Sequence, residues 1–395
     1  MSMSFLSRFS RITSSGRVFL PQLDGLRFIA IAWVFAFHVN HYVEVKTNVS
    51  PDAFGVGLTR VITAGHLGVL LFFCISGFIL ALPFAEAYHK GKAAMSLKKY
   101  FVRRVTRLEP PYLIHLLLVF LAVGILPLLG HRANFPEQIA FLTKHVAASS
   151  VYLHQIIFNE LPGPNVVLWS LEIEIQFYLL APLLSQIFRW KNLVGRRAVM
   201  LAAMLVSYWI SVHYHDNFRV SHSILGHLQY FLIGFLFADR FVASGQQLPQ
   251  SAWWDLGFLC VIAALWLNPG VQWELNPLTP LFMFVVLCAG FQGRFTLRVL
   301  SLTIISTIGG MCYTIYMYHY LLISLIGRLT LRFATGNYLI DLLVHLITHT
   351  AVVLLVCAPL FLLFERPFMA RDWHVRAWKY LRGRPDSPAP ADALL

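Results

Sequence analysis

Charged side chains are scarce in this chain of 395 residues: aspartate, glutamate, lysine and arginine together make up 12% of it. Soluble domains carry about 25% of such residues, and 58% of this chain is hydrophobic, so a water-soluble fold is excluded. Neither an internal repeat nor a soluble catalytic domain is visible in the sequence. We therefore expect an all-α fold, a polytopic bundle of membrane helices.

Cysteine is also rare. The five cysteines, an odd number, include no Cys-x-x-Cys pair, and all of them lie within or beside apolar stretches. These observations indicate neither a disulfide framework nor a zinc site. We interpret the cysteines as small buried hydrophobic residues.

The apolar stretches predict ten transmembrane helices. They lie at about 26–43, 65–85, 107–129, 166–188, 198–215, 223–240, 252–268, 277–291, 303–327 and 338–364. We expect one membrane domain over residues 1–365, followed by a basic cytoplasmic tail over 366–395. The longest connection between spans, 130–165, contains an apolar but partly charged segment that predicts an interfacial or re-entrant helix.

Basic residues outnumber acidic ones, 31 to 18, and the formal net charge is +13. They form short clusters between apolar stretches, which is typical of topology signals and argues against nucleic-acid binding. With ten spans, 24 of the 31 lysines and arginines fall on the side that carries both termini. Because cytoplasmic loops are enriched in these residues, both termini are predicted to be cytoplasmic.

Two ionisable residues, Arg27 and His38, lie eleven positions apart on the first predicted span. At 1.5 Å per residue they are about 16 Å apart along the helix axis, roughly half the hydrocarbon thickness. An arginine at the centre of a span costs about 2.5–3.5 kcal/mol on insertion scales, so such residues usually have a function. The pair could hold an anion at one membrane face and transfer protons within the membrane.

Further polar residues are expected near the depth of His38. Ser170, Glu174 and Tyr178 share one face of the fourth span, at i, i+4 and i+8. His319 belongs to the ninth span. Counted from the outer ends of their helices, Glu174 and His319 lie about as deep as His38 does. A lone histidine in a span is commonly an interhelical hydrogen bonder, but the cluster as a whole favours a functional site.

A basic cluster, Arg103, Arg104 and Arg107, lies where the third predicted span begins. Ordinary topology and lipid-headgroup contact would account for it. Its spacing within about one helical turn equally suits bidentate binding of phosphates, and the residues alone leave both interpretations open. In the second span, Ser76 and Gly77 are small enough to allow close helix packing or the passage of a slim ligand chain.

Asp341, His345 and His349 recur at i, i+4 and i+8 in the tenth predicted span. This spacing suits metal ligation or a proton path, but no further ligand can be located. We interpret the three residues as solvated lining of an outer cavity, and no bound metal is expected.

Six segments of the chain resemble, in order, the motifs of the acyltransferase-3 family of integral-membrane acyltransferases. They are Leu23-Asp24-Gly25-Leu26-Arg27 leading to His38, Phe72-Phe73-Cys74-Ile75-Ser76-Gly77-Phe78, Arg103-Arg104-Val105-Thr106-Arg107 with Pro110 and Tyr112, Trp169-Ser170-Leu171 through Glu174 to Tyr178, Tyr313-Thr314-Ile315-Tyr316-Met317-Tyr318-His319, and Glu365-Arg366-Pro367. Each motif is loose, but six in this order are specific, and they cover nearly the whole chain.

The resemblance implies an enzyme, a membrane-bound O-acyltransferase. Such an enzyme would move an acyl group, with acetyl favoured, from cytoplasmic acyl-CoA to a hydroxyl of a sugar, a cell-envelope glycan or a related acceptor. The expected location is the lipid bilayer of the bacterial cytoplasmic (inner) membrane.

The resemblance also implies roles for single residues. His38 would be the catalytic base. The residues implied to bind acyl-CoA are Arg27, Arg103, Arg104 and Arg107. Apart from the resemblance, a mechanism built on these residues has Glu174 or His319 orienting the acceptor or the imidazole of His38, and the pantetheine arm of CoA lying between helices near Ser76.

Two other functions fit parts of the pattern. A transporter of an anionic or acylated metabolite also lines its path with intramembrane Arg, His and Glu, although neither an inverted repeat nor a pair of broken helices is apparent. A non-catalytic lipid-binding scaffold would need His38 for stability alone. The sequence leaves open the acceptor, the acyl chain length, and the choice between direct transfer and an acyl-enzyme intermediate.

Overall fold

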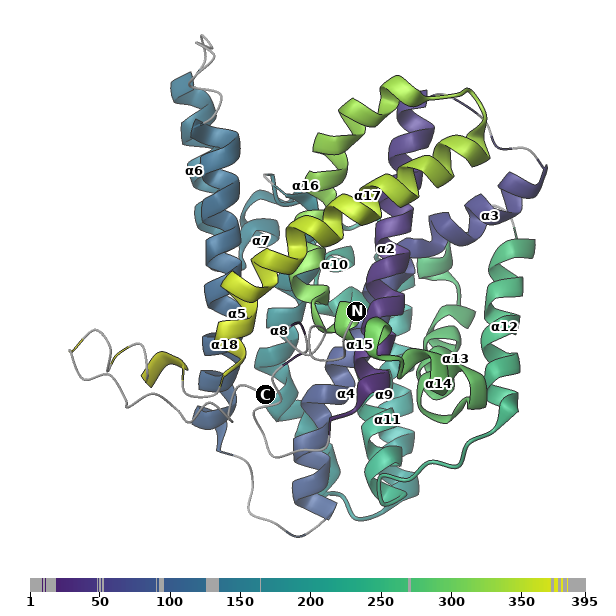
Figure 1. Cartoon of the computed structure of the whole chain (residues 1–395). Helices are drawn as coiled ribbons and strands as arrows, with labels where there is room; N and C mark the ends of the chain where they lie inside the picture. Colours follow the sequence, from purple (N-terminus) through teal and green to yellow (C-terminus); the bar gives the residue numbers. More distant parts are fainter. Residues whose placement is uncertain are drawn as a thin grey trace, which may run out of the picture.

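The computed structural model is a bundle of helices, with no strand among the described residues, which confirms the predicted all-α fold (Figure 1). The structure describes residues 19–382, together with Phe9 and Arg11, except for gaps at 48, 50, 52, 90, 92–95, 126–134, 164, 269–270, 371–372, 376–377 and 379–381.

The α-helices carry most of the fold, and short 3-10 or π turns extend several of them. The α-helices are α2 Pro21–Thr47, α3 Ala53–Thr63, α4 Leu67–His89, α5 Leu97–Val119, α6 Phe135–Ser150, α7 His154–Phe158, α8 Trp169–Leu184, α9 Leu193–His213, α10 Phe218–Ser221, α11 Ile224–Ala243, α12 Ala252–Leu267, α13 Leu278–Gln292, α14 Arg294–Leu300, α15 Thr303–Gly310, α16 Cys312–Thr330, α17 Tyr338–Leu360 and α18 Arg366–Met369. The turns are η1 Ala64–His66, η2 Phe120–Ile125, η4 Val166–Leu168, η5 Ser185–Arg189, η6 Trp273–Leu275, η7 Leu331–Phe333 and η8 Phe361–Glu365.

Long apolar helices make this a multi-pass membrane protein. Within the described ranges, seven helical segments are long and apolar enough to span a bilayer: Pro21–Thr47, Gly55–His89, Leu97–Ala122, Val166–Arg189, Leu193–His213, Phe218–Ala243 and Tyr338–Met369. α13 and α14 together would add an eighth, but the chain bends by 78° between them. The predicted seventh span corresponds to α12, and the predicted ninth is divided into α15 and α16. The count of ten spans and the cytoplasmic termini stay predictions.

The third span begins earlier than the predicted range 107–129. α5 starts at Leu97, directly after the N-cap residue Ser96, whose hydroxyl oxygen accepts a hydrogen bond from the backbone N–H of Lys99 (3.5 Å). The first turns of α5 are therefore basic and the later ones apolar. Hydropathy detects only the apolar part, so it places the boundary too late.

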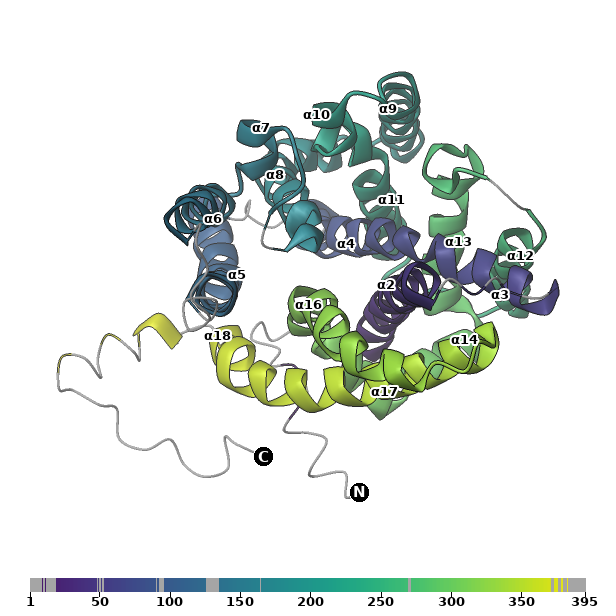
Figure 2. The ribbon, with the colours of Figure 1, turned by 90° about the horizontal axis from the view of Figure 1, so that it is seen from above.

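α2 lies inside the bundle. Figure 2 shows it with α4 on one side and α16 and α17 on the other, and α2 packs against all three helices. α5 and α6 lie beside one another at another edge of the bundle (Figure 2). The helix that carries both Arg27 and His38 is therefore packed against α4 and α16, which carry the predicted site residues Ser76 and His319.

α4 and α11 are held close by small residues. Gly77 of α4 faces the backbone carbonyl of Phe231 on α11, and Gly234 of α11 faces the backbone of Cys74 on α4. Neither position has space for a Cβ atom. Close helix packing, one of the two roles predicted for Ser76 and Gly77, therefore holds for Gly77.

Replacing Gly77 by alanine should lower the melting temperature of the purified protein. The added Cβ would meet backbone atoms of Phe231, which cannot turn aside as a flexible side chain can, and overpacking of this kind typically costs about 1–3 kcal/mol. Gly195→Ala is the matched control, because the Cβ added there would meet its nearest neighbour, a ring carbon of Trp190, at 3.5 Å. Equal melting temperatures for the two variants would contradict the packing argument.

Candidate active site

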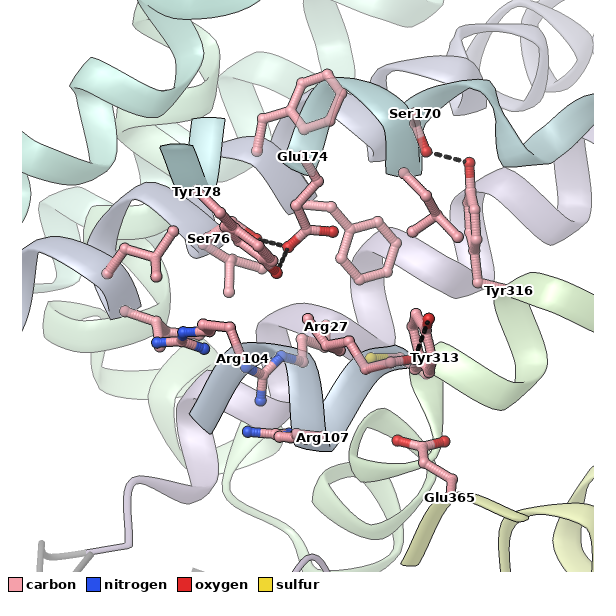
Figure 3. Close-up of a pocket in the computed structure, with 18 of the residues that line it drawn as sticks. Arg27, Ser76, Arg104, Arg107, Ser170, Glu174, Tyr178, Tyr313, Tyr316 and Glu365 are labelled. Carbon is pink, nitrogen blue, oxygen red and sulfur yellow. Dashed lines mark hydrogen bonds between the residues drawn. The ribbon is translucent and has the colours of Figure 1, made fainter. Parts of the chain in front are cut away.

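Two of the cavities among the described residues contain predicted site residues, and the first collects cationic side chains. Its arginines are Arg11 from the N-terminal segment, Arg27 from α2, and Arg104 and Arg107 from α5. Figure 3 shows Arg27, Arg104 and Arg107 along one side of this pocket and Glu174 on the opposite side. We name it the arginine cavity; its volume is about 120 Å³.

The arginines of this cavity differ in their partners. Arg27 is paired with Asp24, one turn earlier on α2, and Arg11 Nη1 lies 3.2 Å from the same carboxylate. The guanidinium of Arg104 instead lies over the rings of Tyr100 and Tyr178, at 5.9 and 5.7 Å from their centroids. Within the described part of the chain, neither Arg104 nor Arg107 forms an ion pair. These two guanidinium groups are therefore the ones best placed to take a phosphate.

Glu174 is fixed by two hydroxyl groups. Ser76 Oγ, from α4, donates a hydrogen bond to Glu174 Oε1 (2.6 Å), and the hydroxyl of Tyr178 donates to the same oxygen (2.5 Å). Glu174 and Tyr178 are four residues apart on α8 and so lie on one face of that helix. The carboxylate thus connects α4 to α8 in the wall opposite the arginines.

The second cavity is lined by imidazole and aromatic rings, and its volume is about 470 Å³. We name it the histidine cavity. Its polar and aromatic lining includes His38, His66, Trp169, His215, His222, His227, Gln272, Glu274 and Tyr316. His66 Nε2 lies 3.0 Å from a carboxylate oxygen of Glu274, and this hydrogen bond lowers the pKa of Glu274 below its usual value.

His38 lines the histidine cavity with His319 beside it. The centroid of the His38 ring is 5.2 Å from that of His319 and 5.1 Å from that of Tyr320. His319 is wholly buried, and its Nδ1 lies 2.7 Å from the carbonyl oxygen of Tyr316. In a neutral imidazole this contact places the proton on Nδ1 and the lone pair on Nε2. His38 forms no hydrogen bond with the described residues, so its ring nitrogens are not committed to another side chain.

Of the described residues, Tyr316 alone lines both cavities. Its hydroxyl donates a hydrogen bond to the carbonyl oxygen of Val167 (2.7 Å) and therefore accepts one from Ser170 Oγ (2.6 Å). Figure 3 shows the Ser170–Tyr316 pair at one end of the arginine cavity. Tyr316 is thus part of the wall between a cationic compartment and an imidazole-lined one.

The structure separates the residues that the resemblance implies for acyl-CoA binding. Arg27, Ser76, Arg104 and Arg107 line the arginine cavity. Arg103 is exposed on α5 and is not part of the lining. The consecutive arginines 103 and 104 differ because neighbouring residues point about 100° apart around a helix, so only one of them faces the cavity.

The three residues predicted to be catalytic do not all lie together: His38 and His319 are adjacent, and Glu174 is in the other cavity. His38 and His319 are neighbours, as depth counting predicts. Glu174 lines the arginine cavity and does not line the cavity that contains His38. Depth along each helix gives the level of a residue but not its lateral position, so it cannot assign Glu174 to one cavity or the other.

Several lining residues are not predicted as site residues. Arg11 counts in the sequence only as part of a basic N-terminal segment, and Glu365 only as part of a family motif. In the structure both line the arginine cavity, and Glu365 accepts hydrogen bonds from the backbone N–H (3.0 Å) and hydroxyl (2.5 Å) of Thr314. Tyr316 stands in the sequence as one of several tyrosines on its helix, and nothing there distinguishes it.

The interpretation of Asp341, His345 and His349 as solvated cavity lining is wrong. All three are buried. Asp341 accepts hydrogen bonds from the backbone N–H groups of Thr335 (2.7 Å) and Gly336 (3.2 Å), which stabilises the turn before α17. The i, i+4 spacing here serves helix packing and capping rather than a polar surface.

Comparison with known proteins supports the acyltransferase assignment. A family model described as an acyltransferase domain matches residues 20–364. The peptidoglycan O-acetyltransferase OatA of Listeria monocytogenes is 28% identical over 217 residues, which are 52% of this chain and 30% of the relative. The O-acetyltransferase OatA of Staphylococcus aureus is 25% identical over 345 residues, which are 78% of this chain and 51% of the relative.

The chain thus spans about half, or less, of the length of these curated relatives. No solved structure gave a significant match. Because the family model covers most of the chain, and every lining residue of the two cavities except Arg11 and Glu365, the protein is an acyltransferase that belongs to the acyltransferase-3 family.

Proposed function

We propose that this acyltransferase takes an acyl group, acetyl by preference, from cytoplasmic acyl-CoA in the arginine cavity and transfers it to a hydroxyl of a sugar or cell-envelope glycan in the histidine cavity. The observation that carries the proposal is that a cationic cavity and an imidazole-lined cavity share one residue, Tyr316. A donor and an acceptor held on either side of this residue would meet without either crossing the bilayer. The printed names of the relatives, both O-acetyltransferases, agree with such a reaction. The corresponding location is the bacterial cytoplasmic membrane.

The donor half of the proposal rests on Arg104 and Arg107. Guanidinium groups form paired, charge-assisted hydrogen bonds with phosphate oxygens, and CoA carries several phosphates at one end. Arg27 and Arg11 lie in the same cavity, and Ser76 lies beyond them in its wall. A CoA molecule with its phosphates at the arginines would extend its pantetheine arm past Ser76 toward Tyr316.

The chemical half rests on His38. A neutral imidazole would accept the proton of the acceptor hydroxyl as its oxygen attacks the thioester carbonyl. The new C–O bond forms, the C–S bond breaks, and the CoA thiolate leaves and takes up a proton. His319, whose Nδ1 is held by the carbonyl of Tyr316, would keep the neighbouring ring of His38 in place. In an alternative with the same residues, the acyl group passes first from CoA to a nitrogen of His38 and then from His38 to the acceptor hydroxyl.

The acceptor half rests on the composition of the histidine cavity. Flat rings such as that of Trp169 can stack on a sugar face, while His66, Gln272 and Glu274 can bond its hydroxyl groups. A volume of about 470 Å³ is within the range of small-molecule pockets.

Radiolabelled acetyl-CoA tests the proposal directly. The purified protein in nanodiscs should transfer the label from acetyl-CoA to peptidoglycan fragments or other glycan acceptors, with release of free CoA. Transport is tested in parallel by counterflow of acylated metabolites into proteoliposomes without CoA. Counterflow without any label transfer would replace the proposal by the transporter alternative.

Replacing Arg104 by alanine should weaken acetyl-CoA binding. Loss of a hydrogen bond to a charged group costs about 1.5–3 kcal/mol, which corresponds to a roughly 10-fold to 150-fold higher Kd for acetyl-CoA. Binding of the glycan acceptor should change little, since Arg104 does not line the histidine cavity. Isothermal titration of both ligands measures the difference.

Arg103→Ala is the matched control for this experiment. It removes the same charge from the adjacent position of α5, but Arg103 is exposed and outside the cavity lining. If both variants lose the same affinity for acetyl-CoA, the loss reflects the overall positive charge of α5 and not a contact in the cavity. The arginine cavity would then lose its assigned role.

A further inference from the structure

Three potential metal ligands meet outside both cavities, where α6, α7 and the segment after α7 come together. They are His145, His154 and Glu160, which we name the loop histidine cluster. One ligand atom of each residue lies within 4.8 Å of those of the other two. His145 Nδ1 is 2.6 Å from His154 Nε2 and 3.6 Å from a carboxylate oxygen of Glu160.

Packing holds both imidazole rings in position. His145 is 4% exposed and His154 is fully buried. The ring of His145 contacts Phe141 and Phe158, with centroid distances of 3.9 and 4.4 Å. Rings restrained in this way lose little conformational freedom when they bind a ligand, so the site is preorganised.

We propose that the loop histidine cluster binds a divalent transition-metal cation of the zinc type. Two imidazole nitrogens and one carboxylate form an established zinc ligand set, with water as the fourth ligand. Imidazole also suits Cu²⁺ and Ni²⁺, whereas Ca²⁺ and Mg²⁺ prefer ligand sets made of oxygen. The cluster therefore selects against the hard cations.

The distances require a small opening of the cluster. Two nitrogens bound tetrahedrally to one Zn²⁺ at about 2.0–2.1 Å lie roughly 3.3 Å apart. His145 Nδ1 and His154 Nε2, now 2.6 Å apart, would separate by about 0.7 Å. The proton between them would move to the other nitrogen of its own ring, so that both imidazoles bind the cation as neutral ligands. The side chain of Glu160 is 54% exposed and can rotate to close the site.

A cation here would connect three elements to α8. The backbone N–H groups of His154 and Gln155 donate to the carboxylate of Glu172 on α8, at 3.1 and 3.0 Å. The segment after α7 contributes Leu161 and Val167 to the wall of the histidine cavity. The metal would therefore stabilise this wall. It would act as a structural ion, apart from the reacting groups.

Metal binding is measured on the full-length protein in detergent, without a polyhistidine tag and after removal of metals by a chelator. Zn²⁺ should bind in a 1:1 ratio by isothermal titration and raise the melting temperature. Co²⁺, used as a probe, should give the visible absorption of a tetrahedral site. Limited proteolysis between residues 135 and 165 should become slower when Zn²⁺ is present.

Variants decide whether this site is responsible. His145→Ala and His154→Ala should each weaken Zn²⁺ binding by at least about 100-fold, since each removes a direct ligand. Glu160→Gln, which keeps the size of a side chain that is 54% exposed, should weaken binding and alter the Co²⁺ spectrum. His213→Ala, which removes an exposed histidine on α9, should change neither. The proposal is overturned by an absence of saturable 1:1 binding, or by binding that persists unchanged in Glu160→Gln and in whichever histidine variants fold.

Discussion

Replacing His38 by alanine should reduce acyl transfer by about 100-fold to 10,000-fold, the range contributed by a general base. Binding of acetyl-CoA should stay the same, because His38 lines the histidine cavity and the arginines line the other. Label transfer to a glycan acceptor and equilibrium binding of acetyl-CoA, measured on one preparation, separate the two effects. Full transfer by the His38→Ala variant would exclude His38 as the base.

The matched control is His41→Ala. His41 lies three residues later on α2 and is exposed, and the histidine cavity does not include it. Transfer by this variant should be close to that of the unchanged protein. A similar loss in both variants would indicate that any histidine on this part of α2 supports folding or insertion, which is what the scaffold alternative requires.

Replacing Tyr316 by alanine should uncouple acyl transfer from the use of acetyl-CoA. The variant opens the wall between the two cavities, so the acceptor and the thioester lose their relative positions. Misplacement by about 1 Å can cost 100-fold in rate. Water from the histidine cavity can then reach the thioester. Transfer to glycan should fall by about 100-fold while hydrolysis of acetyl-CoA continues, so the ratio of hydrolysis to transfer rises.

Hydroxyl deletions on α16 provide the sharper comparison. Tyr316→Phe removes the donor to Val167 and the acceptor for Ser170, whereas the hydroxyl of Tyr318 has no hydrogen-bond partner among the described residues. Tyr318→Phe should therefore leave both hydrolysis and transfer unchanged. If Tyr316→Phe also leaves them unchanged, the hydroxyl does not maintain the wall, and the ring alone would have to do so.

Much of the fold can be predicted from the sequence because long apolar runs can only be buried in lipid or in one another. Exact helix ends cannot, and the basic start of α5 is an example: its first turns are stabilised by a Ser96 cap and not by hydrophobicity. The division of the predicted ninth span into α15 and α16 is another, because its apolar pattern is continuous across Met311. Such breaks depend on neighbouring helices, which a single segment does not encode.

Residues that line a cavity could be predicted where a charge is costly in the membrane, as for Arg27, His38 and Glu174. Which of these residues share a cavity could not, because lateral position depends on how whole helices pack. The difference between Arg103 and Arg104 is a matter of helix rotation, and the role of Tyr316 depends on two cavities meeting. The loop histidine cluster could not be predicted from the sequence for the same reason, since its ligands come from three separate elements.

α2 runs without a break from Pro21 to Thr47, and Arg27 and His38 are lining residues of different cavities on the same rigid rod. Under the proposed function, the fixed separation of Arg27 and His38 along α2 therefore selects donors by the distance between their anionic end and their acyl carbon. A thioester whose anionic end lies about 16 Å along the helix from its acyl carbon would place these two groups at the levels of Arg27 and His38. A shorter thioester would satisfy the base or the arginines but not both. Insertion of one residue between Arg27 and His38 would rotate the imidazole about 100° away from the histidine cavity, so that the donor could no longer reach it.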